Sequence, residues 1–154
     1  MYADDNGRIL MVEIIDNNNK TLLIAIYAPN DNQEDFYRKL HTQIIKLDYA
    51  NVLMMGDWNG VVDGKLDYKT QTITKKIKKT LPKSFFQMME ELNLKDIWRE
   101  RNINEKQYTF YSNRHSSWSR IDMVWISAEI QDIEIGTSIW ADHNPITVVW
   151  KGQR

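Results

Sequence analysis

Hydrophobic positions in the first third of the chain form two runs of strand length. Residues 8–15 and 21–27 are rich in apolar and β-branched side chains, and residues 16–20 between them are mostly Asp and Asn. Two such runs joined by a short turn-forming segment predict an antiparallel hairpin. A proline ends the second run, and Asn30 or Asp31 is expected to cap the helix that follows.

The next two elements differ in their hydrophobic period. Between Phe36 and Leu47, apolar residues recur every three or four positions, which predicts a helix with one apolar face. Residues 51–55 are then wholly apolar and predict a short buried strand. This strand ends at residues 56–60, where glycine, Asp and Asn cluster at its tip.

The second half of the chain begins irregularly and ends in strands. Residues 61–83 show no clear period, and a second amphipathic helix is expected from Phe85 to Leu92, with Ile97 and Trp98 near its end. Strands are predicted at 108–112, 120–127 and 145–150, with a weaker one at 132–139. Strands and helices mixed in this order predict an α/β (α+β) sandwich.

Composition and charge exclude several classes of protein. The 154 residues are enough for one domain, and the net charge of −1 gives no bulk attraction to nucleic acid. The chain has no cysteine, which excludes disulfides, zinc–thiolate sites and thiol nucleophiles. No apolar stretch approaches the roughly 18 residues of a membrane span, and the first residues lack the pattern of a signal peptide. We therefore expect an intracellular protein without a membrane partner.

Polar groups at the tips of apolar strands are the candidates for chemistry. In the segment Gly56-Asp57-Trp58-Asn59, the side chains of Asp57 and Asn59 alternate to one side of an extended tip. An acid and an amide there can hold a phosphate and position a water or a leaving group. The same residue types also form ordinary Asx turns, and the spacing alone leaves both interpretations open.

Asp122 and His143 are also open to both a structural and a functional interpretation. Asp122 interrupts an apolar run at 121–126, where a carboxylate is unfavourable unless it is paired or faces solvent. His143 precedes the last predicted strand; a histidine is the usual general base near neutral pH when a carboxylate fixes its tautomer. Asp122 is a candidate for that carboxylate, although a single histidine in a turn is more often incidental.

Taken in order, five short motifs resemble one superfamily. The chain carries IYAPN at 26–30, GDWN at 56–59, YTF at 108–110, SRID at 119–122 and ADHNP at 141–145. Together they resemble the endonuclease/exonuclease/phosphatase superfamily, and within it the apurinic-type endonuclease domain of LINE retrotransposons. The resemblance implies a two-sheet sandwich flanked by helices, like deoxyribonuclease I, with the active site where the strand tips of both sheets meet.

The resemblance also implies a function: metal-dependent hydrolysis of phosphodiester bonds, as a DNA-nicking endonuclease. His143 matches the general base and Asp122 the acid that orients it. Asp57 and Asn59 match the pair that contacts the scissile phosphate and assists the leaving group. Tyr27 matches a tyrosine that contacts phosphate or supports the site.

The remaining matches concern the metal and the substrate. Asp142 matches the acid next to the histidine, near a Mg²⁺ or Mn²⁺ ion, and no small-molecule cofactor is implied. Thr109, Ser119 and Arg120 match positions near the DNA backbone or behind the site. An active enzyme of this type would be expected in the nucleus; its oligomeric state is left open.

Other groups are weaker candidates for contact with DNA. Six lysines lie between Lys69 and Lys83 and are able to touch phosphates, although a solvated loop is the simpler interpretation. Trp58 and Trp118 lie near the motifs and are also candidates to reach DNA.

Two departures from the family pattern lower the expected activity. Ala141 stands where the family commonly has serine. The first strands of the family, which carry an asparagine and a metal-binding glutamate, have no counterpart, and Glu13 lies in a strand of different register. We therefore expect residues 1–154 to form a partial domain with weak or no activity. The alternatives are a non-catalytic nucleic-acid-binding remnant of such a domain, or a superfamily enzyme acting on nucleotide or lipid phosphates.

Overall fold

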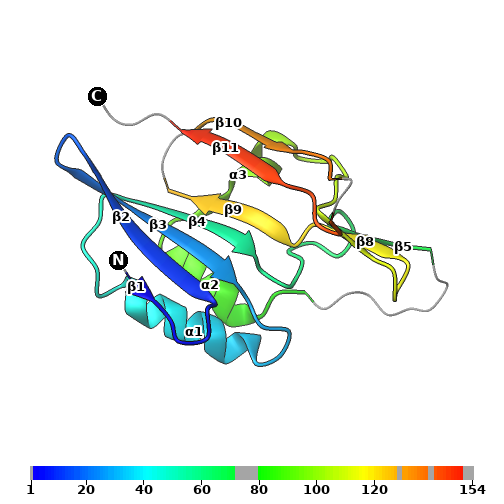
Figure 1. Cartoon of the computed structure of the whole chain (residues 1–154), viewed down its shortest axis with the longest axis horizontal. Helices are drawn as coiled ribbons and strands as arrows, with labels where there is room; N and C mark the ends of the chain where they lie inside the picture. The colour runs from blue at the N-terminus through cyan, green and yellow to red at the C-terminus, as the bar shows by residue number, and fades with distance from the viewer. Residues whose placement is uncertain (1, 72–79, 128–129, 139–140, 151–154) are drawn as a thin grey trace.

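A computed structural model describes residues 2–71, 80–127, 130–138 and 141–150. It confirms a mixed α/β architecture in which two helices cover one face of a central sheet and a second, smaller sheet lies against the other face (Figure 1). The first seven elements are β1 (Tyr2–Ala3), β2 (Ile9–Asp16), β3 (Asn19–Tyr27), α1 (Gln33–Ile44), β4 (Asn51–Asp57), β5 (Tyr68–Thr70) and α2 (Lys83–Glu91). The remaining elements are β6 (Lys95–Asp96), α3 (Ile97–Arg101), β7 (Phe110–Ser112), β8 (Ser117–Ser119), β9 (Asp122–Ile126), β10 (Ile130–Ile135) and β11 (Ile146–Trp150).

The predicted hairpin is present as β2 and β3. Asp16 pairs with Asn19, so the loop consists of Asn17 and Asn18, whose φ angles are 48° and 66°. Asparagine tolerates this left-handed region better than most residues. A two-residue turn of this kind matches the twist of the strands on either side.

The strand order of the central sheet brings three polar residues that are distant in sequence to the same end of neighbouring strands. The order is β1-β2-β3-β4-β9-β6, with β3 and β4 parallel and joined by α1. Tyr27 at the end of β3 pairs with Asp57 at the end of β4, and Asp57 pairs with Asp122 at the start of β9. The topology therefore assembles one polar tip from segments that are far apart in sequence.

Close packing of β3 against β4 depends on Gly56. Its φ is +142°, and a Cβ atom there would lie 1.9 Å from the carbonyl oxygen of Ile26. Only glycine fits this position without moving one of the strands. Asp57 follows directly, so the same glycine sets where the Asp57 side chain leaves the sheet.

The larger core lies between the sheet and helices α1 and α2. Trp58 is fully buried there, with its ring centroid 5.3 Å from that of Phe85 and 6.0 Å from that of Tyr37. Its indole N–H donates to the carbonyl oxygen of Met123 at 3.1 Å. The hypothesis that Trp58 reaches DNA is therefore wrong, because the tryptophan is a core residue.

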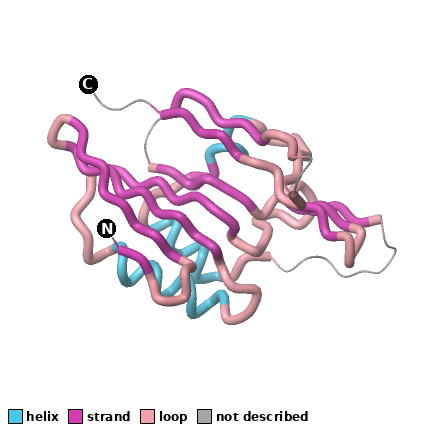
Figure 2. Tube along the Cα trace, in the orientation of Figure 1, coloured by secondary structure: helices cyan, strands magenta, loops and turns pink. Residues whose placement is uncertain are grey.

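The opposite face of the sheet packs against β10, β11 and α3. Leu53 of β4 and Val124 of β9 form a second core cluster with Ile133 and Ile135 of β10. β10 and β11 pair antiparallel and form the second layer (Figure 2). This arrangement of two sheets with flanking helices agrees with the sandwich that the motifs implied.

Helix α1 begins differently from the prediction. Asn32, rather than Asn30 or Asp31, occupies the cap position, with a φ of 56° and no side-chain capping hydrogen bond. Leu47 lies beyond the end of α1 and is 39% exposed, so it does not extend the apolar face. The face is instead completed by Tyr37, which the periodicity did not single out.

Two further details of the second half differ from the prediction. Ile97 and Trp98 do not end the second helix, because β6 intervenes and they begin the separate helix α3. A three-stranded sheet of β5, β8 and β7 was not predicted as a unit, and it lies at one end of the molecule (Figure 2). Most of the lysine stretch falls in residues 72–79, outside the described residues. Among the helices described, none is long and apolar enough to cross a membrane.

Candidate active site

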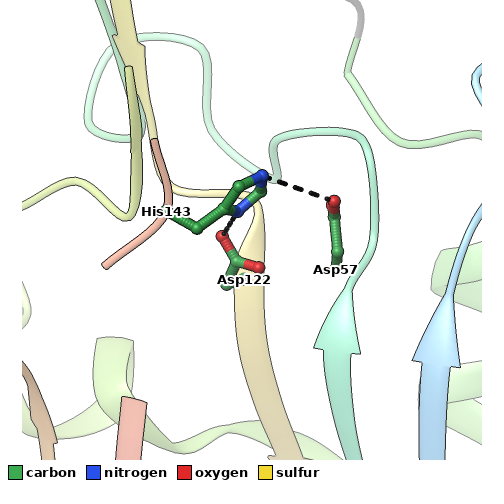
Figure 3. A group of neighbouring side chains, drawn as sticks. All are labelled: Asp57, Asp122 and His143. Carbon is green, nitrogen blue, oxygen red and sulfur yellow. Dashed lines mark hydrogen bonds and ion pairs between the residues drawn. The ribbon is translucent and has the colours of Figure 1, made fainter. Parts of the chain in front are cut away.

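Asp57, Asp122 and His143 meet at the tips of the two sheets (Figure 3). The Nδ1 atom of His143 lies 2.8 Å from Oδ2 of Asp122, within hydrogen-bonding distance. The Nε2 atom, on the other side of the ring, lies 3.9 Å from Oδ2 of Asp57. The imidazole thus stands between two carboxylates, tightly bonded to one and loosely facing the other.

Backbone hydrogen bonds hold the His143 loop against residues 109–111. The amide N–H of Tyr111 donates to the carbonyl oxygen of Asp142 at 3.1 Å, and the N–H of Asn144 donates to that of Thr109 at 2.6 Å. The ring of Phe110 packs on the imidazole, with centroids 4.7 Å apart. The loop therefore behaves as a short extra strand, and the histidine ring has a fixed neighbour on one side.

Asp122 is held from behind by Thr109, which is fully buried. The hydroxyl oxygen of Thr109 accepts the amide N–H groups of Ile121 and Asp122, each at 3.1 Å. Burial raises the pKa of Asp122 above its ordinary value, as does the charge of Asp57 more weakly, whereas hydrogen bonds from His143 and Thr109 oppose this rise.

The loop that carries Asp57 and Asn59 is an Asx turn fixed from below. Oδ1 of Asp57 accepts the amide N–H of Asn59 at 2.9 Å, and Nδ2 of Asn59 donates to the carbonyl oxygen of Ala28 at 2.7 Å. The buried side chain of Gln33 donates to the carbonyl oxygen of Asn59 at 2.9 Å, and the Tyr37 hydroxyl donates to that of Trp58 at 2.8 Å. Helix α1 therefore positions this loop, and the Asx turn that the sequence analysis gave as one of its two interpretations is present.

Tyr27 flanks the same tip on the strand beside Asp57. Its side chain is 55% exposed, and the guanidinium of Arg8 lies 5.4 Å from the ring centroid. A cation over an aromatic ring at this distance is favourable. The tyrosine is thus accessible at the edge of the site.

The three residues assigned to substrate binding lie underneath the site. Thr109, Ser119 and Arg120 are 0%, 2% and 1% exposed. The guanidinium of Arg120 donates to Asp67 and to Asp96, both buried. Such burial favours support of the strands over contact with a substrate.

Comparison with known proteins gives the fold. No family model matches the chain. It is 26% identical over 150 residues to the transposon TX1 uncharacterized 149 kDa protein of Xenopus laevis, covering 92% of this chain and 11% of that protein. The AP endonuclease LMAP from Leishmania major superposes with a TM-score of 0.71 at 18% identity, over 94% of this chain and 55% of that one. The endonuclease domain of TRAS1, a telomere-specific non-LTR retrotransposon, gives 0.68 at 18% identity, over 96% and 65%.

The chain therefore shares the fold of these two endonucleases, and of an endonuclease/exonuclease/phosphatase family protein from Leptotrichia buccalis, which superposes with a TM-score of 0.58 at 13% identity over 93% of this chain and 52% of that one. The structural part of the resemblance drawn from the five motifs is therefore confirmed. The chain spans about a tenth (11%) of the transposon protein and 55% and 65% of the two endonuclease chains.

The donor atoms at the strand tips partly suit a divalent metal. One ligand atom from each of Asp57, Asp122 and His143 lies within 4.8 Å of the others. Mg²⁺ prefers oxygen ligands and keeps several waters, so two carboxylates supply a sufficient minimum. Asp142, to which the resemblance assigned the metal, is exposed beside the histidine and lies outside this group of described side chains.

The sequence analysis missed the residues that hold the candidate site in shape. Gln33 bonds to the loop that carries Asp57, Phe110 packs on His143, and Asn144 ties the loop of His143 to Tyr108. Asn144 and Phe110 lie inside the quoted motifs, so their place beside His143 was a usable signal. Gln33 had none, because an amide at the start of a helix is common on solvated surfaces.

The burial of Asp122 leads to a prediction about stability. Because burial raises the pKa of the folded-state carboxyl above 3.8, the folded chain binds more protons than the unfolded chain between 3.8 and the raised pKa. The Asp122 contribution to stability therefore falls as the pH rises through that window. In Asp122→Asn this fall is absent, and we expect the variant to be at least as stable as the wild type at neutral pH.

Urea unfolding of both proteins from about pH 4 to about pH 8 measures this difference. An exposed aspartate, Asp31, offers a matched control in Asp31→Asn, whose pH profile should follow that of the wild type. A wild type that gains stability relative to Asp122→Asn as the pH rises would contradict the prediction.

Proposed function

We propose that this chain hydrolyses phosphodiester bonds in DNA with a divalent metal, acting as a nicking endonuclease of the LINE retrotransposon type. The observation that carries the proposal is the 2.8 Å contact between His143 and Asp122, beside Asp57 at the strand tips. A base oriented by a carboxylate next to a second acidic group is an arrangement suited to activating water.

The orientation of the histidine follows from what its partner accepts. An ionised carboxylate only accepts hydrogen bonds, so Asp122 holds the proton on Nδ1 of His143 and leaves a lone pair on Nε2. A water beside Nε2 gives up a proton to it, and its oxygen forms a bond to phosphorus. The bond from phosphorus to the leaving oxygen then breaks, and that oxygen takes a proton from solvent water and departs as an alcohol, while His143 returns its extra proton to solvent.

Asp57 and Asn59 are proposed to contact the scissile phosphate and assist the leaving group. A divalent ion, when bound, supplies positive charge that stabilises the phosphate in the transition state. Asp57 and Asp122 are the carboxylates proposed to hold it, together with water and phosphate oxygens, and the exposed Asp142 is proposed to lie near it, as the resemblance implied. So small a ligand set favours a metal affinity in roughly the millimolar range, so the rate should rise with Mg²⁺ concentration up to that range.

DNA as the substrate is supported by aromatic and basic side chains near the site. On the sheet of β5, β7 and β8, the rings of Tyr111 and Trp118 lie 4.8 Å apart, and the ammonium of Lys69 lies 5.2 Å from the Trp118 ring. Single-stranded or distorted nucleic acid binds to surfaces of this kind, because its bases stack on aromatic rings and its phosphates contact the adjacent cations. Local groups of this kind suit a chain whose net charge of −1 provides no general attraction.

The proposal is tested by incubating the purified chain with supercoiled plasmid and millimolar Mg²⁺. We expect slow conversion to the open-circular form, because the carboxylates and His143 supply the minimum set for metal-assisted hydrolysis. An excess of chelator should abolish it, and Mn²⁺ in place of Mg²⁺ should restore it. Agarose gels measure the rate.

Parallel reactions with a nucleotide monophosphate and a soluble lipid phosphate separate DNA nicking from other phosphoester hydrolysis. A folded chain that binds plasmid in the presence of chelator but never nicks it would contradict the proposal. That result would favour a non-catalytic nucleic-acid-binding domain instead.

A further inference from the structure

Asn144 joins three segments of the chain directly behind His143. Its side-chain Nδ2 donates to the carbonyl oxygen of Tyr108 at 3.0 Å, and its Oδ1 accepts the amide N–H of Ser138 at 3.1 Å. Its own amide N–H donates to the carbonyl oxygen of Thr109 at 2.6 Å. One carboxamide therefore uses both a donor and an acceptor to tie its loop to two other segments.

The same segments carry the partner of the histidine. Thr109 accepts the backbone N–H of Asp122 on its hydroxyl, so a hydrogen-bonded path runs from Ser138 through Asn144 and Thr109 to Asp122. The His143 ring closes this path through its 2.8 Å contact with Asp122. The distance between base and carboxylate is thus set by a loop that Asn144 anchors.

From this arrangement we infer that Asn144 is a positioning residue, which holds His143 in the orientation where Nδ1 faces Asp122 and Nε2 faces Asp57. The inference deepens the proposed function and rests on it as far as catalysis is concerned. The backbone bonds hold the loop against residues 109 and 111 on one side. The Asn144 side chain adds a bond from Nδ2 to the carbonyl oxygen of Tyr108 and accepts one from the amide of Ser138, so it fixes the loop to a further segment and restricts how far the histidine can turn.

The two side-chain hydrogen bonds of Asn144 require both the donor and the acceptor of its carboxamide. Leucine has the same branched arrangement of side-chain heavy atoms as asparagine, with bulkier methyl groups and neither a donor nor an acceptor, so Asn144→Leu removes both contacts. Aspartate retains an acceptor for Ser138 but has no donor for Tyr108, so Asn144→Asp removes one contact. Asn104, an exposed asparagine in the loop after α3, provides the matched control Asn104→Leu.

The experiment combines two readouts on the same proteins. In alkaline buffer, the ¹⁵N chemical shifts of the His143 ring report which nitrogen carries the proton, independently of activity. We expect the wild type and Asn104→Leu to hold the Nδ1–H form, Asn144→Leu to show a mixture of the two tautomers, and Asn144→Asp to lie between them. Plasmid nicking by Asn144→Leu should fall by roughly 10- to 100-fold, in kcat rather than in KM.

The outcomes separate the inference from the proposed function. If the tautomer changes in Asn144→Leu but the wild type never nicks DNA, the positioning role is supported and the proposed endonuclease activity is contradicted. If the wild type nicks DNA and Asn144→Leu keeps the single Nδ1–H tautomer, the positioning role is overturned and the proposed endonuclease activity stands. Should Asn144→Leu fail to fold, Asn144→Asp decides by the same criterion, and a wild-type spectrum for it overturns the inference.

Discussion

Replacing His143 with alanine is expected to lower the rate of plasmid nicking by roughly 10²- to 10⁴-fold, the usual contribution of a general base. The imidazole lies between Asp122 and Asp57, and no other described histidine is near this pair. Its removal leaves a water at the strand tips without a neutral acceptor for its proton. The rate of conversion of supercoiled to open-circular plasmid at saturating Mg²⁺ measures the effect.

His41→Ala is the matched control, because it removes an imidazole on the far side of the central sheet. His41 lies on α1, where its Nε2 atom is 2.7 Å from a carboxylate oxygen of Glu91 on α2. This variant should nick at the rate of the wild type. If His143→Ala retained nicking within tenfold of the wild type while chelator still abolished it, the histidine would not be the base.

The parts of the fold that could be predicted are those whose signals are local. The hairpin follows from two β-branched runs and from Asn17 and Asn18, which accept a left-handed backbone. The buried strand β4 follows from an apolar run that ends in glycine. In both cases neighbouring residues alone determine the element, so no distant partner had to be known.

Other parts depend on distant partners and could not be predicted. The sheet of β5, β8 and β7 consists of strands of three residues each, too short to show a period. The cap position of α1 is occupied by Asn32 because Gln33 turns inward to bind the loop around Asn59. That contact spans 26 positions and has no trace in the local pattern.

The candidate site also has features that the sequence predicts and features that it does not. The identities of Asp57, Asp122 and His143 follow from motif order, because polar residues at strand tips are unusual among apolar neighbours. Their convergence follows from the strand order, which places β9 beside β4. Arg120 illustrates what the motif could not show, since its charge suggests a phosphate contact, whereas its side chain is 1% exposed.

Asp67→Ala should destabilise the chain by about 3–5 kcal/mol, because it breaks a buried ion pair and leaves the guanidinium groups of Arg99 and Arg120 with Asp96 as the one remaining carboxylate of the network. Oδ1 of Asp67 lies 2.8 Å from Nε of Arg120 and 2.6 Å from a guanidinium nitrogen of Arg99. The backbone carbonyl oxygen of Asp67 also accepts the amide N–H of Arg120 at 2.8 Å. Urea unfolding at neutral pH measures the difference in free energy.

Two comparison variants separate the buried charge from other effects. Asp35 pairs with Arg38 on the surface of α1, where the Asp35 side chain is 68% exposed, and Asp35→Ala should change stability by no more than about 1 kcal/mol. Asp67→Asn keeps the shape and an acceptor oxygen but removes the charge. It should fall between the wild type and Asp67→Ala. A loss below about 1 kcal/mol in Asp67→Ala would mean that Asp96 alone compensates Arg120.

This ion network bears on the site through its position in the chain. Arg120 stands two residues before Asp122, and its guanidinium also reaches Asp96 in the edge strand β6. The network therefore holds the start of β9 against both the 67 loop and β6. A milder variant that still folds, Asp67→Asn, should consequently show altered ¹⁵N shifts at His143, because the carboxylate that orients the ring sits on the strand that Arg120 anchors.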